Sequence, residues 1–172
     1  MSAPVIRAGA REKAARVTLL LLDVDGVLTD GRLYYGPEGE VLKVFDVRDG
    51  HGIVMLRDHL DVGILSGRSV GPMRARVEDL RFKHLLFGQK EKLPAYQELI
   101  QRLGLDDAEV AFMGDDVNDV PVLRRVGLAA CPADACPEAR AAVHLVSPFP
   151  GGHGAVRQLC ELILRAMGLW KY

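Results

Sequence analysis

The sequence predicts an α/β fold in which a doubly wound parallel sheet carries helices on both faces, because short apolar runs alternate with helical patterns along the chain. Residues 17–22 show no polar alternation, which is typical of a strand buried on both faces of a parallel sheet. Residues 31–47 interrupt this rhythm with two β-rich runs around a Gly/Pro turn, which predicts a hairpin that projects after the first strand.

The other elements follow in order along the chain. Further strands are expected at residues 62–65, 84–87, 110–113 and 127–130. Helices are expected at residues 52–60, 70–80, 91–103, 119–125 and 155–167, the last with its apolar residues at helical spacing. The hairpin would expose apolar side chains on an isolated chain, so we expect it to pair with another subunit.

The composition indicates one soluble globular domain rather than a nucleic-acid or membrane protein. The 172 residues suit a single domain, 1–172, with a core over 17–167. A formal net charge of −1 provides no overall attraction to nucleic acid or an anionic membrane, and no apolar run approaches the roughly 20 residues of a membrane span. Three cysteines without a C-x-x-C pair, and a start without a signal-peptide core, predict a cytoplasmic protein with reduced thiols.

Polar residues that could perform chemistry gather where the predicted strands end. Asp23 and Asp25 end the first strand, Ser66 and Arg68 the second, and Asp115 a later one, with Lys92 downstream of the strand between them. In a doubly wound sheet, ligands bind beyond the carboxyl ends of the strands. Each motif alone is common in turns and surface loops, but their joint occurrence at strand ends predicts one site.

The residue types point to metal-assisted phosphoryl transfer. Asp23, Asp25 and Asp115 could not all stay charged at close range without a cation, and hard oxygen ligands favour Mg²⁺. Asp23 would then be the nucleophile, and Asp25 would protonate the leaving alkoxide and later activate water. Ser66 could hold phosphoryl oxygens, and Lys92 would supply a fixed positive charge.

These residues resemble the motifs of the haloacid dehalogenase superfamily. The match covers, in order, residues 23–29, Ser66, Lys92 and residues 114–119. The resemblance implies Mg²⁺ held by the Asp23 side chain, the Asp25 main-chain carbonyl and Asp115, with Asp119 in support near Lys92. Only about 25 residues separate Ser66 from Lys92, too few for a separate cap domain, so we expect a capless enzyme.

Within that superfamily, residues 18–167 are similar to the 3-deoxy-D-manno-octulosonate 8-phosphate phosphatases, above all at 45–50 and 151–157. The resemblance implies hydrolysis of that sugar-acid phosphate through an aspartyl-phosphate, in lipopolysaccharide precursor biosynthesis. It also implies a homotetramer assembled through the hairpin, in which a neighbouring subunit helps to close each site. A Gly-rich segment, 151–154, corresponds to a mobile flap in that family.

The same resemblance implies which residues contact the substrate. They are Asp46, Val47, Arg48, Asp49, Gly50, Arg68 and Arg76, the last acting in a neighbour's site. We expect 46–50 to form a loop. Its Arg-Asp-Gly triplet favours the eight-carbon sugar acid over the nine-carbon sugar-acid 9-phosphates of close relatives, which remain the alternative substrates. His153 and Gln158 stand where the family's flap usually has a basic and an acidic residue.

A receiver domain of a signalling protein is the alternative from another class. Such domains also combine an acidic cluster, a phosphoacceptor Asp, a hydroxyl residue and a Lys on a parallel sheet. A receiver needs a long-lived phosphoaspartate and has no use for a second carboxylate two residues on. Asp25 therefore favours a hydrolase, as does the position of Asp23 on the first strand rather than a middle one.

Overall fold

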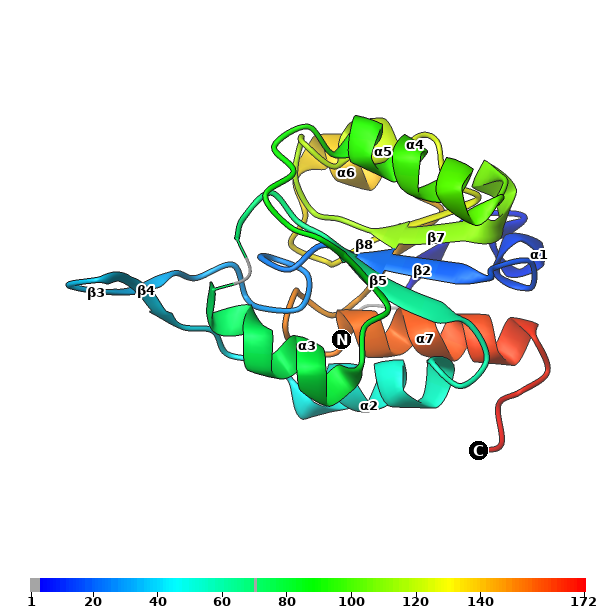
Figure 1. Ribbon diagram of the computed structural model, residues 1–172. Coiled ribbons are helices and arrows are strands. Elements are labelled where there is room, and N and C mark those ends of the chain that lie inside the picture. Colours follow the sequence, from blue (N-terminus) through cyan, green and yellow to red (C-terminus); the bar gives the residue numbers. More distant parts are fainter. Residues whose placement is uncertain (1–3, 70) are drawn as a thin grey trace.

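The computed structural model describes residues 4–69 and 71–172 and places a seven-stranded sheet between two layers of helices (Figure 1). The strand order is β1-β9-β8-β7-β2-β5-β6. All neighbouring strands run parallel except β1 and β9, so the predicted parallel sheet is confirmed. The strands are β1 (Val5–Ile6), β2 (Leu19–Leu22), β5 (Asp61–Leu65), β6 (His84–Leu86), β7 (Val110–Met113), β8 (Leu128–Cys131) and β9 (Leu145–Val146).

Helices cover both faces of this sheet, as a doubly wound fold requires (Figure 1). One layer contains α1 (Ala10–Ala14), α2 (Val47–Leu56), α3 (Arg74–Leu80) and α7 (Ala155–Ala166). The other contains α4 (Lys92–Leu103), α5 (Val120–Leu123) and α6 (Pro137–Ala142). Short 3-10 turns occur at Gly71–Met73 and Asp107–Glu109. In the described residues no helix has the length and apolar character needed to cross a membrane.

The strand β2, which lies between β7 and β5, explains why the two layers hold together. Its four leucines are fully buried. Leu20 and Leu22 pack with the α7 layer, whereas Leu19 and Leu21 pack with the α4 layer. Side chains alternate along a strand, so a run of leucines contributes to both cores at once. The unbroken apolar run therefore correctly predicted β2, the strand that Asp23 follows.

One local prediction was wrong. Residues 46–50 were expected as a loop before a helix at 52, but α2 begins at Val47. The Asp46 side chain caps the helix by accepting a hydrogen bond from the Arg48 backbone N–H at 2.6 Å. Gly50 and Gly52 lower the helix propensity of this segment, so the sequence did not predict that the helix begins at Val47. The expected helix start at residue 70 lies outside the described residues; α3 begins at Arg74.

Four short elements were not predicted: β1, α1, α6 and β9. The strands β1 and β9 contain two residues each, too few for a periodic pattern. The N-terminal segment adds an antiparallel edge strand, with Val5 opposite Val146. Arg7 fixes it by donating to the carbonyl of Ala141 at 3.1 Å. Residues upstream of β2 thus contribute to the sheet edge farthest from β6.

The predicted hairpin is present and projects from the sheet (Figure 1). Its strands, β3 (Tyr34–Gly36) and β4 (Gly39–Leu42), pair antiparallel and are shorter than expected. Gly39 has φ +114°, a conformation open to glycine, where the chain turns back. Exposed apolar side chains on and beside the hairpin include Leu33, Tyr34, Tyr35, Val41, Leu42 and Val44.

Candidate active site

The sheet order brings the predicted catalytic residues together. Strands β7, β2 and β5 are neighbours, so their carboxyl ends place Asp115, Asp23 and Ser66 side by side. They line a cavity of about 260 Å³. The residues around this cavity are Asp23, Asp25, Gly26, Gly31, Ser66, Gly67, Arg68, Asp115, Asp116 and Asn118. A larger cavity, of about 700 Å³, lies between α7 and the C-terminal residues, away from these strand ends.

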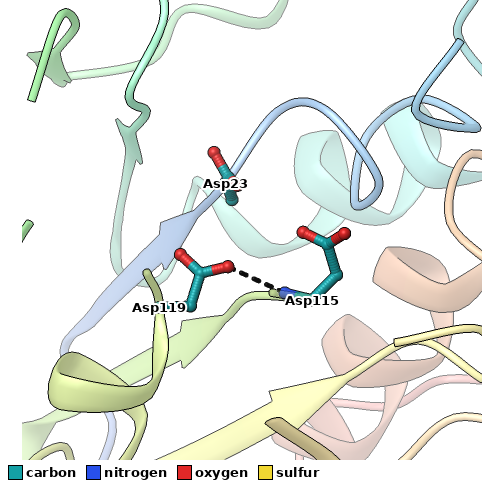
Figure 2. Close-up of side chains that lie close together, drawn as sticks. All are labelled: Asp23, Asp115 and Asp119. Carbon is teal, nitrogen blue, oxygen red and sulfur yellow. Dashed lines mark hydrogen bonds between the residues drawn. The ribbon is translucent and has the colours of Figure 1, made fainter. Parts of the chain in front are cut away.

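Lys92 links two carboxylates at the base of the site. Its buried ammonium group lies 2.9 Å from the Asp23 carboxylate and 2.5 Å from that of Asp119. The other Asp119 oxygen accepts from the backbone N–H groups of Asp115 at 2.9 Å and Asp116 at 3.1 Å, the first drawn in Figure 2. Asp119 therefore fixes both the lysine and the loop that carries Asp115.

The carboxylates of this site carry more negative charge than one lysine balances. Burial raises the pKa of Asp23 to about 6, although Lys92 opposes the shift. Burial, followed by repulsion from Asp23 and Asp119, raises the pKa of Asp115 to about 8. At neutral pH Asp115 would thus hold a proton unless a cation took its place.

The residues present fit a divalent cation. Asp23, Asp115 and Asp119 each offer an oxygen within 4.8 Å of the others (Figure 2). Asp119 already accepts hydrogen bonds at both oxygens, which leaves Asp23 and Asp115 as side-chain ligands. Asp115 Oδ1 is buried and has no hydrogen-bond partner among the described residues. Oxygen-only donors suit Mg²⁺, with the Asp25 main-chain carbonyl as the third expected ligand.

Glycine lets the loop after β2 lie against Asp115. A Cβ on Gly26 would lie 2.1 Å from Asp115 Oδ2, and the residue has φ +83°. Any side chain here would displace the Asp115 carboxylate and strain the backbone. Gly26 is thus required for the Asp115 carboxylate to lie beside Asp23.

Asp25 is held by residues of the hairpin. Lys43 Nζ pairs with Asp25 Oδ1 and lies 2.7 Å from Glu40 Oε1. Arg68 also contributes, with Nη2 3.0 Å from Glu40 Oε2 and Nε 3.5 Å from Asp25 Oδ2. Burial alone would raise the pKa of Glu40, but Lys43 and Arg68 together hold it below its ordinary value.

Comparison with known proteins assigns this arrangement to a family. Residues 62–159 match the sequence model of the haloacid dehalogenase-like hydrolases, more than half of the chain. The chain belongs to the haloacid dehalogenase-like hydrolases. It is 45% identical to the 3-deoxy-D-manno-octulosonate 8-phosphate phosphatase KdsC of Yersinia pestis, over 90% of this chain and 83% of that protein. The predicted family resemblance is therefore confirmed.

Solved structures of relatives share the fold of this hydrolase. The Yersinia pestis phosphatase superposes with a TM-score of 0.90 at 44% identity, over 94% of this chain and 88% of that one. The Moraxella catarrhalis phosphatase, solved with magnesium, phosphate and KDO, has a TM-score of 0.89 at 36% identity, with 92% of each chain covered. The predicted fold class is confirmed by these matches.

The predicted substrate-binding residues lie in two places. Arg68 lines the cavity beside Asp25. The stretch from Asp46 to Gly50 forms the cap and first turn of α2, where Val47 is 79% exposed and Arg48 donates to the His153 carbonyl at 3.0 Å. These contacts join the start of α2 to the Gly-rich segment.

Asp49 and Arg76 do not line the cavity of their own subunit. Asp49 is buried and accepts from the backbone N–H groups of Gly154 at 3.1 Å and Arg157 at 2.7 Å. Burial raises its pKa, although these two backbone donors oppose the shift. Arg76 stacks over the Phe45 ring at 5.6 Å and pairs with Asp79. The Arg76 guanidinium also lies against Gly50, where an added Cβ would be 2.1 Å from Nη2.

The Gly-rich segment 151–154 packs tightly against the loop after β2. A Cβ on Gly151 would lie 1.9 Å from the Gly26 carbonyl oxygen, so the backbones touch there. Gly152 donates to the Val27 carbonyl at 3.0 Å, and Gly151 to Asp134 at 3.0 Å. In this structure the segment is therefore held directly against the site.

Three residues of the site were missed by sequence reasoning: Glu40, Lys43 and Asn118. Lys43 left one usable signal, a single charge inside a run of apolar β-formers. Asn118 belongs to the Gly-Asp-Asp-x-Asn-Asp motif but was not assigned a role. The catalytic set Asp23, Asp25, Ser66 and Lys92, and the metal set Asp23, Asp25 and Asp115, all lie at the cavity or against it.

Proposed function

We propose that this protein is a magnesium-dependent phosphatase that hydrolyses 3-deoxy-D-manno-octulosonate 8-phosphate to the free sugar acid and phosphate. The observation that carries the proposal is the pair Asp23 and Asp25 at one strand end, with Lys92 2.9 Å from Asp23. A phosphoaspartate switch needs only the first carboxylate, whereas hydrolysis of the intermediate needs the second.

Asp23 is the nucleophile in this mechanism. Its carboxylate attacks phosphorus, and the bond to the sugar oxygen breaks as Asp25 donates a proton to that oxygen. The ionised Asp25 then takes a proton from water, which attacks the phosphorus and releases phosphate and free Asp23. Ser66, Lys92 and the backbone beside Ser66 hold the phosphoryl oxygens. Mg²⁺ at Asp23, Asp115 and the Asp25 carbonyl supplies charge neutralisation.

The proposed substrate assignment rests on the relatives and on the start of α2. The Moraxella catarrhalis structure holds magnesium, phosphate and KDO, and it covers 92% of this chain. We assign sugar-acid or phosphate contacts to Asp46, Val47, Arg48, Gly50, Arg68 and Arg76. Asp49 was predicted with them, but its two oxygens accept from Gly154 and Arg157, so we assign it a supporting role in this segment. The exposed Arg48 guanidinium at the α2 terminus is well suited to a carboxylate.

The proposed unit is one cytoplasmic phosphatase domain, 1–172, in a homotetramer. Apolar side chains on the hairpin support the assembly: Tyr35 is 64% and Val41 60% exposed. A subunit packed there would also shield the open site from water, which strengthens electrostatic stabilisation of the transition state. Arg76 of one subunit would then contribute to the site of the next.

A phosphate-release screen tests this function. Octulosonate 8-phosphate is compared with nine-carbon sugar-acid 9-phosphates, each with and without Mg²⁺. We expect Mg²⁺-dependent release that is fastest with the eight-carbon substrate. Faster release from a nine-carbon ester would replace the proposed substrate but keep the reaction. A stable phosphoprotein that forms from a small phosphodonor without phosphate release would overturn the hydrolase itself.

A further inference from the structure

The run from Val41 to Phe45 buries its charged residue and exposes most of its apolar ones. Val41, Leu42 and Val44 are exposed, whereas the charged Lys43 is buried, its side chain 2% exposed. Burying an ammonium group is strongly unfavourable unless it is paired. A hairpin that served only to assemble subunits would have no need of a buried lysine. The groups that pair with Lys43 therefore indicate its role.

Those partners belong to the active site. Lys43 Nζ contacts Asp25 Oδ1, and Glu40 Oε1 lies 2.7 Å from the same nitrogen. The other oxygen, Asp25 Oδ2, is buried and has no hydrogen bond within the described part of the chain, with Arg68 Nε the nearby cation at 3.5 Å. Lys43 thus fixes one oxygen of Asp25, and no hydrogen bond from the described residues occupies the other.

We propose that Lys43 is a positioning residue for Asp25: the hairpin buries Lys43 so that it holds Oδ1 and presents Oδ2 to the leaving oxygen and then to water. This inference rests on the proposed function. The catalytic carboxylate follows β2, while the groups that orient it come from the hairpin of the same subunit. The hairpin therefore has a role in each site that is separate from assembly.

Glu40 completes the arrangement by balancing charge. It accepts from Lys43 at one oxygen and from Arg68 at the other, at 2.7 and 3.0 Å. Tyr35 supports the same arginine, with its hydroxyl 3.2 Å from Nη2. Lys43 and Arg68 thus approach Asp25 from two sides, and both are fixed by the hairpin.

The test uses two esters that differ in their need for an acid. The leaving group of p-nitrophenyl phosphate departs without protonation, whereas the sugar alkoxide of octulosonate 8-phosphate needs a proton. Both are followed by rapid quench with saturating Mg²⁺ in wild type, Lys43→Met and Lys43→Arg. Lys83→Met is the matched control. Lys83 pairs with Asp61 at the start of β5, whereas the site lies at the other end of that strand.

Loss of Lys43 should affect the steps that need proton transfer by Asp25 and spare the step that does not. In Lys43→Met we expect phosphoryl transfer from the sugar ester to slow about 100-fold, within the range of general acid catalysis. Transfer from the aryl ester should stay within about threefold of wild type, giving a burst of one p-nitrophenolate per subunit before slow turnover. KM should change little, Lys43→Arg should recover most of the rate, and Lys83→Met should behave as wild type.

Two outcomes would overturn the proposal. Equal slowing of transfer from both esters would make Lys43 merely structural, and a raised KM with unchanged transfer rates would make it a substrate ligand. If Lys43→Met does not fold, Lys43→Gln is measured by the same criterion. If wild type leaves the sugar ester intact, the proposed substrate fails, but the aryl burst still tests Lys43, since water activation requires Asp25 for any ester.

Discussion

Mg²⁺ affinity should rise steeply between about pH 6 and pH 8, because the metal must displace a proton from Asp115. The pKa of this carboxyl group is raised to about 8 by burial and by Asp23 and Asp119. Its ionised fraction would grow from roughly 1% at pH 6 to one half at pH 8, so the apparent Kd should fall roughly 50-fold from this group alone. Asp23, with a pKa of about 6, adds to the trend in the same direction.

Stability of the metal-free protein should change in the opposite direction. Both carboxyl groups have a folded pKa above the unfolded value, so the folded state binds more protons and stability falls as pH rises from about 4 to about 8. Mg²⁺ replaces those protons and should remove most of the fall. Asp115→Asn should flatten the pH dependence and weaken Mg²⁺ binding at least tenfold at about pH 8.

Isothermal titration calorimetry of metal-free protein measures this linkage. Titrations at pH 6, 7 and 8, in two buffers of different ionisation enthalpy, give both Kd and the number of protons released. About one proton should be released near pH 7 in the wild type and almost none in Asp115→Asn. A Kd that stays within threefold over this pH range, with no proton release, would refute the assignment of Asp115 as a buried metal ligand.

Three further variants test the surrounding structure. Asp119→Ala removes a partner of the buried Lys92 and should lower the free energy of unfolding by about 3–5 kcal/mol in urea titrations; a loss under 1 kcal/mol would contradict the buried pair. Asp49→Ala removes the acceptor for the first turn of α7 and should cost about 1–2 kcal/mol, while Asp58→Ala, on the exposed end after α2, should cost little. Val41→Asp should shift the mass in sedimentation from tetramer towards smaller species, and a wild type that is monomeric at every concentration would refute the assembly.

Much of the fold could be predicted because local pattern and tertiary structure agree. The leucines of β2 sit between two helical layers, so both faces of the strand require apolar residues. The strands β5 and β7 lie between the same two layers and flank β2, so the carboxyl ends of all three strands are neighbours. The convergence of Asp23, Ser66 and Asp115 thus followed from chain order and sheet topology alone.

The rest depends on contacts that leave little trace in sequence. The start of α2 is set by the Asp46 cap and by packing of Gly52 against Arg157, which outweigh the poor helix propensity of glycine. Asp49 fits the family's substrate segment by sequence, yet its side chain caps α7, about 100 residues away in the chain. Lys43 contacts Asp25 only because the hairpin folds back on the site.

Trapping the phosphoenzyme tests the central claim most directly. Wild type is mixed with octulosonate 8-phosphate and Mg²⁺, quenched in acid within the first turnover and digested for mass spectrometry. We predict one phosphoryl group per subunit on Asp23, and none in Asp23→Asn, which should keep its thermal transition but release no phosphate. A phosphoryl group on another residue, or wild-type turnover by Asp23→Asn, would contradict Asp23 as the nucleophile.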